Sequence, residues 1–571
     1  MYNRAKSIFS NLFLSIPVAL LMYLVLVPMV LLLVGGFKPS GLVIDTGFTL
    51  DNYLRVYTQA RTYELMFNTL VFAGGSTLLG LFLSITLAWI VQRTNIPFKA
   101  WLRTAIIAPM GIPMILVAMG WALLASPRIG FLNSVLMQIF NLSQSPLNIF
   151  SMPGMIFVQG IVMVPSSFLL LSTTFNNIDP AFEEASAMSG VGTFSTLRRI
   201  VFPLLRPGVL AVAITSFLVG LAAFDIVGVL GTKARITVLS TEIYFATTQT
   251  EGGLPDFGKI SALSSVFFVT ILGLSYLYNR QTQISARFAT ITGREYRPKL
   301  IDLGRWKYAA MIFVGGYMLV AIVLPVASLV WQSLTPYYGP FSLDKLHLVS
   351  LDNYRAVLNY PRVGLAIQNT LTIAVASASV LVCLATIISW IIVRSKYRAR
   401  RLLDVLSMLP MAFPQIMLGV ALLFVYLVVK IGVYGTIWII AIAYITAYIP
   451  YSTRTLNSTM FQIHKDLEEV AQVSGASWTR IMRTIILPLL MPSIIGLWVW
   501  VLIHAMRELS AALMLQSSKN YVLTTVMWNM WENAELPLVA AVGVGLVVFL
   551  FLVMGVGQIL ASRFQISTGM Q

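Results

Sequence analysis

The sequence predicts an all-α polytopic membrane protein with about 12 transmembrane helices in two homologous six-helix halves. Hydrophobic residues account for 58% of the 571 residues and charged residues for only 10%, and the mean hydropathy is +0.84. Soluble globular domains are much less apolar. The apolar stretches repeatedly reach the ~20 residues that a helix needs to cross a bilayer, and the two halves of the chain repeat one another.

The apolar stretches are predicted to be helices rather than barrel strands. Backbone polar groups in hydrocarbon must be paired within the segment, and the period-two alternation of barrel strands is absent. The first half holds predicted spans at 8–34, 63–92, 104–125, 154–175, 208–231 and 258–280. The second half holds predicted spans at 306–332, 367–393, 405–428, 436–453, 493–516 and 537–560.

The net charge of +17 follows membrane topology and does not indicate a nucleic-acid partner. With the N-terminus inside, the inside segments hold 25 of the 38 basic residues and 9 of the 21 acidic ones. Such an excess of Lys and Arg is typical of cytoplasmic segments. We therefore expect both termini to be cytoplasmic and the partners to include membrane lipid.

The two halves align without gaps from residue 50 when the sequence is shifted by 301. Leu50–Tyr53 then matches Leu351–Tyr354, and Arg93 matches Arg394. Beyond spans 3 and 9 the offset drops to 285, because the first half carries an extra segment near Phe131–Met155. Six spans return the chain to its starting side, so the repeats are parallel. We predict halves at 1–295 and 296–571, with a pathway along the pseudo-twofold axis.

A charged inside loop occurs once in each half, at about 176–207 and 461–492. We expect a short helix, ended by a glycine in a left-handed C-cap, and then a second helix running to a proline. Asp179-Pro180 and Asp466 are the expected helix starts, the latter with a capping-box spacing to Glu469. A duplicated amphipathic loop predicts a docking element for a partner. Its matching residues are Glu183, Glu184, Gly190, Ile200 and Pro203, and Glu468, Glu469, Gly475, Ile485 and Pro488.

This spacing resembles the E-A-A-x3-G-x9-I-x-L-P loop of permeases in binding-protein-dependent ATP-binding cassette importers, here in a fused two-half form. Ser186, Val470 and Phe202 depart from the pattern but stay small or apolar. The resemblance implies the type I importer permease fold, in the bacterial inner membrane. It also implies that each loop forms a coupling helix for one of two ATP-binding cassette subunits, and that a periplasmic substrate-binding protein docks outside.

The chain is not expected to be an enzyme or to hold a cofactor. The segment Gly253–Lys259 has the G-x4-G-K spacing of a phosphate-binding loop, but Ile260 follows where Ser or Thr would hold Mg²⁺. ATP and magnesium are therefore assigned to a separate partner ATPase.

Two groups of residues are candidates for the translocation pathway. Proline removes a backbone hydrogen bond, so the Pro-Met-x-x-Pro segments break spans 3 and 9, either as pathway lining or as a packing kink. A charge at mid-bilayer costs ~3 kcal/mol, so embedded ionisable residues should face the interior, as part of a pathway or as an internal ion pair. The candidates are Pro109, Met110, Pro113, Asp225, Pro410, Met411, Pro414, His504, Arg507 and Glu508.

Two sequence spacings predict which of the embedded ionisable residues lie near one another. Under the offset of 285, Asp225 falls opposite Ser510, and His504 stands three and four residues before Arg507 and Glu508, as helical neighbours do. Three histidines and one cysteine provide no transition-metal constellation, and carboxylates are sparse, so no metal site is predicted.

The run Arg507–Leu515, with Trp528–Asn533 after it, resembles the iron(III) branch of the fused permeases, which implies ferric iron as cargo. Phosphonate, sugar phosphate, thiamine or another small anion are alternative cargoes. An ion-coupled secondary transporter and an exporter are alternative machines. Outside, we expect the capture protein to meet Asp51-Asn52-Tyr53, Asp352-Asn353-Tyr354 and the loops 233–257 and 517–536.

Overall fold

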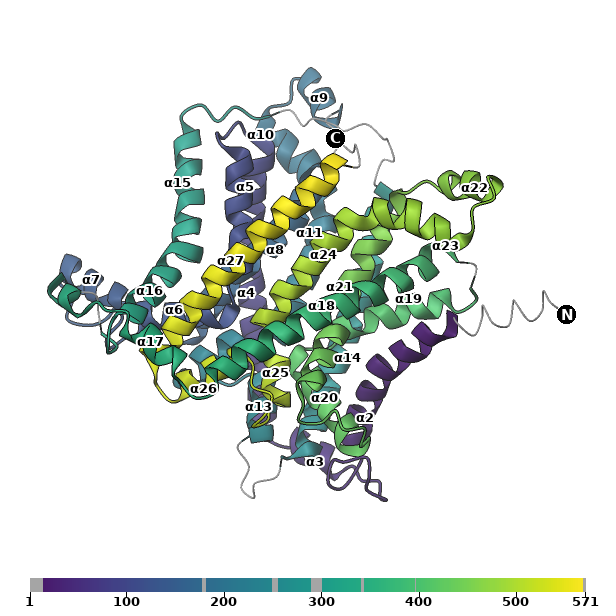
Figure 1. Ribbon diagram of the computed structural model, residues 1–571. Helices are drawn as coiled ribbons and strands as arrows, with labels where there is room; N and C mark the ends of the chain where they lie inside the picture. Colours follow the sequence, from purple (N-terminus) through teal and green to yellow (C-terminus); the bar gives the residue numbers. More distant parts are fainter. Residues whose placement is uncertain are drawn as a thin grey trace.

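The computed structural model describes residues 14–176, 181–248, 255–288, 300–339, 343–395 and 397–567, and these ranges are largely helical. Figure 1 shows one bundle of long helices, from which the short helices α9 (Ala181–Met188) and α22 (Asp466–Val473) project. Within the described ranges, nine helices are long and apolar enough to cross a membrane, or up to eleven if two bent pairs each count as one span. The predicted all-α polytopic fold is confirmed.

Eight of the predicted spans correspond to long helices. In the first half these are Leu14–Gly35, α4 (Ala60–Arg93), α8 (Met152–Asn176) and α14 (Phe257–Phe288). In the second half they are Trp306–Leu334, α18 (Val363–Arg394), α21 (Ile437–Gln462) and α27 (Leu536–Ser567). Helix α21 has enough residues to cross a bilayer, but its Tyr, Thr and Ser residues lower its hydropathy below that of the other spans.

Spans 3 and 9 are each broken at the Pro-Met-x-x-Pro segment, as predicted. The first consists of α5 (Lys99–Ile107), the 3-10 turn η2 (Ala108–Gly111) and α6 (Met114–Ala125), with a bend of 93°. The second consists of α19 (Arg400–Met408), η7 (Leu409–Ala412) and α20 (Gln415–Val428), with a bend of 111°. Both bends lie at the Pro-Met-x-x-Pro segments, whose prolines cannot complete the helical hydrogen bonds.

The predicted bounds of spans 5 and 11 are also wrong. Helices α11 (Phe202–Ala222) and α24 (Leu487–Arg507) end where Ala223 and Glu508 adopt extended backbone, with ψ of 130° and 127°. The apolar residues beyond the breaks form separate short helices, which are η4 (Val227–Gly231), α12 (Thr232–Ala234) and α25 (Ser510–Leu515). Hydrophobicity alone does not reveal such a break.

Pro203 and Pro488 do not end helices as predicted. Four π-helical turns in the described ranges each end two residues before a proline. The wider π turn relieves the clash of the proline ring with the preceding turn. The helix therefore continues through Pro203 and Pro488, and the loops lead directly into α11 and α24. The turns are η1 (Met22–Leu26), η3 (Leu197–Val201), η5 (Leu319–Val323) and η8 (Met482–Ile486).

The first span of each half packs against the other half. Helix α2 (Val27–Gly35) contacts α20, and α16 (Leu324–Leu334) contacts α6. The approach at α6 is close, because a Cβ atom added to Gly120 would lie 2.7 Å from the carbonyl oxygen of Pro325. The Ser328 hydroxyl also donates to the Gly120 carbonyl at 3.0 Å. The halves are thus interlocked, and the predicted boundary near residue 295 lies outside the described residues.

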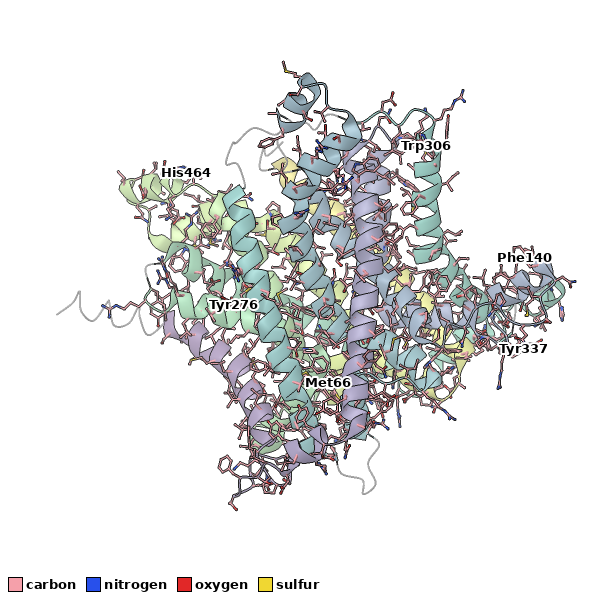
Figure 2. All side chains as sticks on the ribbon, turned by 180° about the vertical axis from the view of Figure 1, so that it is seen from behind. Met66, Phe140, Tyr276, Trp306, Tyr337 and His464 are labelled. Carbon is pink, nitrogen blue, oxygen red and sulfur yellow. The ribbon has the colours of Figure 1, made fainter. Side chains whose placement is uncertain are left out.

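The extra segment of the first half forms α7 (Phe131–Phe140), a short apolar helix at the edge of the bundle. Figure 2 shows Phe140 and Tyr337 at this edge. The Asn133 amide holds the segment by donating to the carbonyls of Ser126 and Leu147, each at 2.9 Å.

Candidate functional site

The two inside loops have the predicted shape. Helix α9 is followed by α10 (Thr193–Thr196), and α22 is followed by α23 (Trp478–Ile481). Gly190 and Gly475 have φ of +72° and +81°, so the predicted left-handed caps are confirmed. In both loops the residue after this glycine donates its N–H to the carbonyl five residues earlier, at 3.1 and 3.0 Å. This is the bond of a Schellman cap.

The two predicted helix starts have different outcomes. Asp179-Pro180 and the side chains of Glu183 and Glu184 lie outside the described residues. The capping box at Asp466 is wrong, because Lys465 is the N-cap of α22 and makes no side-chain cap. The Asp466 carboxylate instead lies 3.1 Å from Nδ1 of His464. The acidic residues in the first turn of α22 still interact favourably with the positive end of the helix dipole.

Each loop exposes apolar side chains at matching positions, which sequence reasoning missed. Met188 and Val473 are 90% and 89% exposed and correspond under the offset of 285. Phe182 and Leu467 form a second matching, exposed pair. All eight residues of α22 are described, and none is buried. An apolar surface repeated on two projecting helices is typical of a protein docking site.

The other predicted coupling residues occupy distinct surroundings. Glu469 is exposed, whereas an oxygen of Glu468 lies 3.0 Å from Nε of Arg394. Ile200 and Ile485 are half-buried, and Pro203 and Pro488 are exposed just after the π turns. The second-loop helices run from Trp478 to Arg507 without interruption, and those of the first loop from Thr193 to Ala222. Each loop is therefore joined by a continuous helix to the middle of the molecule.

Ser186, which departs from the E-A-A-x3-G-x9-I-x-L-P pattern, is explained by a contact within the first loop. Its hydroxyl lies 2.7 Å from the hydroxyl of Thr196 and joins α9 to α10. In the second loop the equivalent positions are Ala471 and Ile481, which both pack against one small hydrophobic cluster. The two loops thus make the same contact with a polar pair in one half and an apolar pair in the other.

Ser186→Ala is expected to destabilise the first loop by about 1 kcal/mol, because it removes one hydrogen bond from buried Thr196. Adding Thr196→Ile recreates the second-loop combination and is expected to recover most of the loss. Amide hydrogen exchange of residues 181–196 measures both effects. Equal exchange in the single and double variants would contradict the explanation.

The predicted pathway residues meet in the middle of the molecule. Arg507 donates to the Met110 carbonyl in the break of span 3. The Ser510 hydroxyl donates to the Asp225 carboxylate at 3.3 Å, so the residues predicted to face each other are in contact. Glu508 directly follows Arg507 and stands two residues before Ser510, so all three ionisable residues lie in this region. Both halves therefore contribute to one charged cluster, which lies at the inner ends of α11 and α24.

Glu508 lies at the break between α24 and α25. Its carboxylate accepts from the backbone N–H of Ala511 at 3.2 Å. With its amide nitrogen facing the cluster, Gln415 also donates to this carboxylate. Gln415 follows Pro414, the N-cap of α20. Sequence reasoning missed Gln415, although its place beside a predicted helix break was a signal.

Of the two helical neighbours predicted for His504, only Arg507 lies on the same helix. Glu508 lies beyond the end of α24, so the expected spacing of four residues is not helical. The His504 ring stacks on Trp500, with ring centres 3.8 Å apart, and its Nδ1 lies 2.8 Å from the Trp500 carbonyl oxygen. His504 belongs to an aromatic group with Tyr448 and Tyr451.

Aromatic residues of both halves pack together beside Asp225, which follows Phe224 in sequence. Phe224, Tyr244 and Trp528 lie with ring centres 5.3–5.7 Å apart. Trp528 donates its indole N–H to the Tyr244 hydroxyl at 3.1 Å. Tyr244 and Trp528 come from α13 (Leu239–Thr248) and α26 (Leu523–Glu532), which are largely buried. The expectation that 233–257 and 517–536 are docking loops is therefore wrong for these helices.

The repeated Asp-Asn-Tyr segments hold the fold together rather than forming an open surface. Asn52 donates to the carbonyls of Gly36 and Lys38, and Asn353 donates to those of Ser333 and Thr335. The hydroxyls of both tyrosines lie within 3.0 Å of a serine hydroxyl. Of the two segments, only Asp51 and Asp352 are exposed.

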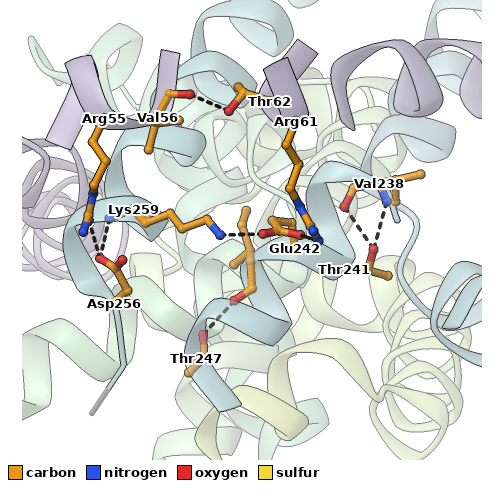
Figure 3. Close-up of polar contacts among 11 residues, drawn as sticks. Arg55, Val56, Arg61, Thr62, Val238, Thr241, Glu242, Thr247, Asp256 and Lys259 are labelled. Carbon is orange, nitrogen blue, oxygen red and sulfur yellow. Dashed lines mark hydrogen bonds and ion pairs between the residues drawn. The ribbon is translucent and has the colours of Figure 1, made fainter. Parts of the chain in front are cut away.

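Helix α13 is anchored to its own half by an ion-pair network (Figure 3). The buried Glu242 carboxylate lies 3.1 Å from Arg61 and 2.5 Å from Lys259, at the ends of α4 and α14. Nearby, Arg55 and Asp256 form a pair at 2.8 Å. Burial alone would raise the pKa of Glu242. The hydrogen bonds and positive charges of Lys259 and Arg61 lower this pKa by more than burial raises it. The pKa of Glu242 therefore lies below its ordinary value of 4.5.

The Glu242 network should make stability depend on pH in acid. A lowered folded-state pKa gives a contribution that is full above pH 4.5 and is lost as the pH falls through the folded value. Glu242→Gln is expected to cost about 1 kcal/mol at pH 7 and less at pH 4. Thermal unfolding of both proteins at each pH measures this, with Glu64→Gln on the exposed face of α4 as control. An equal loss of stability for Glu242→Gln at pH 7 and pH 4 would contradict this prediction.

Among the described residues, no group of three or more His, Cys, Asp or Glu side chains is placed to hold a metal ion.

Comparisons with known proteins identify one matching family and several relatives. The family described as "Binding-protein-dependent transport system inner membrane component" matches residues 80–287 and 381–566, once in each half. The ferric transport system permease protein FbpB of Actinobacillus pleuropneumoniae is 26% identical over 517 residues, which are 88% of this chain and 72% of that protein. A putative ferric transport system permease of Haemophilus influenzae is 25% identical, over 88% and 78% of the two chains. The trehalose/maltose permease MalF of Thermococcus litoralis is 28% identical, over only 40% of this chain and 77% of its own.

Proposed function

Because this chain belongs to the family of binding-protein-dependent transport system inner membrane components, we propose that it is the permease of an ATP-driven importer that carries ferric iron into the cell. ATP is hydrolysed by a separate subunit, of which one copy docks on each inside loop, and this chain binds no cofactor of its own. Both termini then lie in the cytoplasm of a bacterium, and a periplasmic binding protein delivers the cargo.

The duplicated loop carries this proposal. Both copies have a left-handed glycine and expose apolar side chains at the same two positions. Two equivalent docking surfaces suit two identical ATPase subunits. An ion-coupled carrier would have no use for such surfaces.

The transport mechanism follows from the continuous helices. When the ATPase subunits close on ATP, they move α9 and α22, and the motion reaches α11 and α24 through the π turns. These helices end at Ala222 and Arg507, beside Asp225 and Glu508. Rocking of the halves then opens the charged cluster to one side at a time. In this proposal the aromatic group of Phe224, Tyr244 and Trp528, next to Asp225, forms the gate on the periplasmic side of the cluster.

The ferric cargo is supported by three relatives that each match 88% of this chain and are named as ferric or Fe(3+) transport permeases. The cluster also offers two carboxylates, Asp225 and Glu508, against one guanidinium, that of Arg507. Carboxylate oxygens suit a hard cation better than a phosphonate or sugar phosphate, which would need several cationic donors.

Reconstitution tests the proposal. The permease, its ATPase subunit and the binding protein loaded with ferric iron are placed in proteoliposomes, and iron uptake is measured. We expect uptake only with ATP and with all three components. Uptake driven by a proton or sodium gradient without the ATPase would identify a secondary carrier, and outward transport an exporter. ATP-driven uptake of a phosphonate but not of iron would overturn the cargo.

A further inference from the structure

Arg394 joins three helices at the cytoplasmic side of the second half. It is the last residue of α18, and its side chain is only 5% exposed. Its Nε lies 3.0 Å from the Glu468 carboxylate, in the first turn of α22. Its Nη2 donates to the carbonyls of Met460 and Ile463, at the end of α21, at 3.0 and 2.5 Å. One guanidinium therefore connects α18, α21 and α22.

Helix α22 has little else to hold its orientation. None of its eight described residues is buried, and Leu467, Val470 and Val473 are exposed. Ala471 is partly buried against a small cluster below the helix. The buried members of this cluster are Val393, Met460, Ile463, Ile481, Ile486 and Leu490.

The first half repeats the arrangement at sequence level. Arg93 ends α4 as Arg394 ends α18, and it is fully buried. The offset of 301 pairs these arginines, and the offset of 285 pairs Glu183 with Glu468. The same two residue types thus occur at matching sequence positions in both halves, although Ser186 and Thr196 show that neighbouring contacts have diverged.

The chemistry of arginine suits such a junction. A guanidinium stays protonated in proteins, and its planar fork binds several acceptors at fixed angles. Buried beside apolar side chains, it requires a matching negative charge, and loss of that charge leaves an uncompensated cation. The Glu468 carboxylate is therefore drawn toward the bundle, while the adjacent Glu469 faces outward.

We propose that Glu468 and Arg394 are positioning residues, which lock the coupling helix α22 to α18 and α21 so that movement of the ATPase reaches the bundle. Glu468 thus transmits force, whereas Glu469 is available to the ATPase. The inference rests on the proposed function, since it requires an ATPase that pushes on α22.

The test compares Glu468→Gln with its neighbour Glu469→Gln in the full reconstituted complex. Both changes remove one negative charge from the same turn. For Glu468→Gln we expect normal co-purification of the ATPase subunit and hydrolysis within twofold of wild type, but at least tenfold less iron transported per ATP hydrolysed. Amide exchange of residues 466–473 should also become faster. For Glu469→Gln we expect weaker ATPase binding and an unchanged transport-to-hydrolysis ratio.

The outcomes separate this inference from the proposed function. A wild-type complex without ATP-driven transport overturns the function itself. If wild type transports and Glu468→Gln keeps both its transport ratio and its exchange rates, the positioning role is overturned. Weaker ATPase binding in Glu468→Gln than in Glu469→Gln also overturns it, because Glu468 would then be a contact residue. Arg394→Lys is a second variant, which keeps the charge but not the fork, and an unchanged ratio there counts against the proposal.

Discussion

Replacing Gly190 and Gly475 together by valine is expected to weaken binding of each ATPase subunit about 5- to 30-fold. Both glycines have a left-handed backbone, with φ of +72° and +81°. A β-branched residue there costs ~1–2 kcal/mol at each site, and each ~1.4 kcal/mol is a factor of ten in affinity. The strain is relieved only if the loop changes shape and moves Met188 and Val473 out of their docking positions.

Gly192→Val is the matched control for this double variant. Gly192 lies two residues after Gly190, its φ is outside the left-handed region, and an added Cβ would meet no described atom within 4 Å. Affinity of the purified permease for the ATPase subunit, measured in detergent, distinguishes the variants. If the double variant binds as tightly as the control, the left-handed caps have no part in docking.

Arg507→Met is expected to destabilise the protein by about 3 kcal/mol and to abolish transport. The change removes the donor to the Met110 carbonyl, which joins the second half to the break in span 3. It also leaves Asp225 and Glu508 without the cation that lies in the same region. Removing one partner from a buried charged group is costly because the remaining charge is uncompensated. Thermal unfolding and iron uptake in proteoliposomes measure the two effects.

A second substitution tests this reasoning. Adding Glu508→Gln to Arg507→Met removes one of the two uncompensated charges, and we expect part of the lost stability to return. Arg480→Met, at an exposed position of α23, serves as the control for loss of an arginine. A loss of stability in Arg507→Met no larger than in this control would show that the cluster does not hold the halves together.

Prolines show how far the fold could be predicted. Pro109, Pro113, Pro410 and Pro414 were correctly read as breaks, because proline lacks the N–H that a helix needs. The same argument failed at Pro203 and Pro488, where a π turn two residues earlier lets the helix continue. The difference depends on the geometry of the preceding turn, which residue type alone does not determine.

The candidate site was predicted best where the internal repeat or the cost of burial applied. The repeat placed Asp225 opposite Ser510, and the two are hydrogen-bonded. The cost of burying a charge in hydrocarbon correctly predicted that Arg507 and Glu508 face the interior of the protein. The acceptor Met110 could not be foreseen, because it lies 397 residues away from Arg507 in sequence. The exposed Met188 and Val473 were missed because an apolar residue in a hydrophobic chain carries no signal until its surroundings are known.

The exchange of first spans between the halves has a consequence for biosynthesis. Helix α2 completes its packing only when α20 is present, and the ribosome makes Gln415–Val428 long after Leu14–Gly35 has entered the bilayer. The amino-terminal helix must therefore wait in lipid, or against the insertion machinery, while most of the chain is translated. The first half cannot mature as an independent unit during synthesis, and truncated products that stop before α20 should be substrates for membrane proteases.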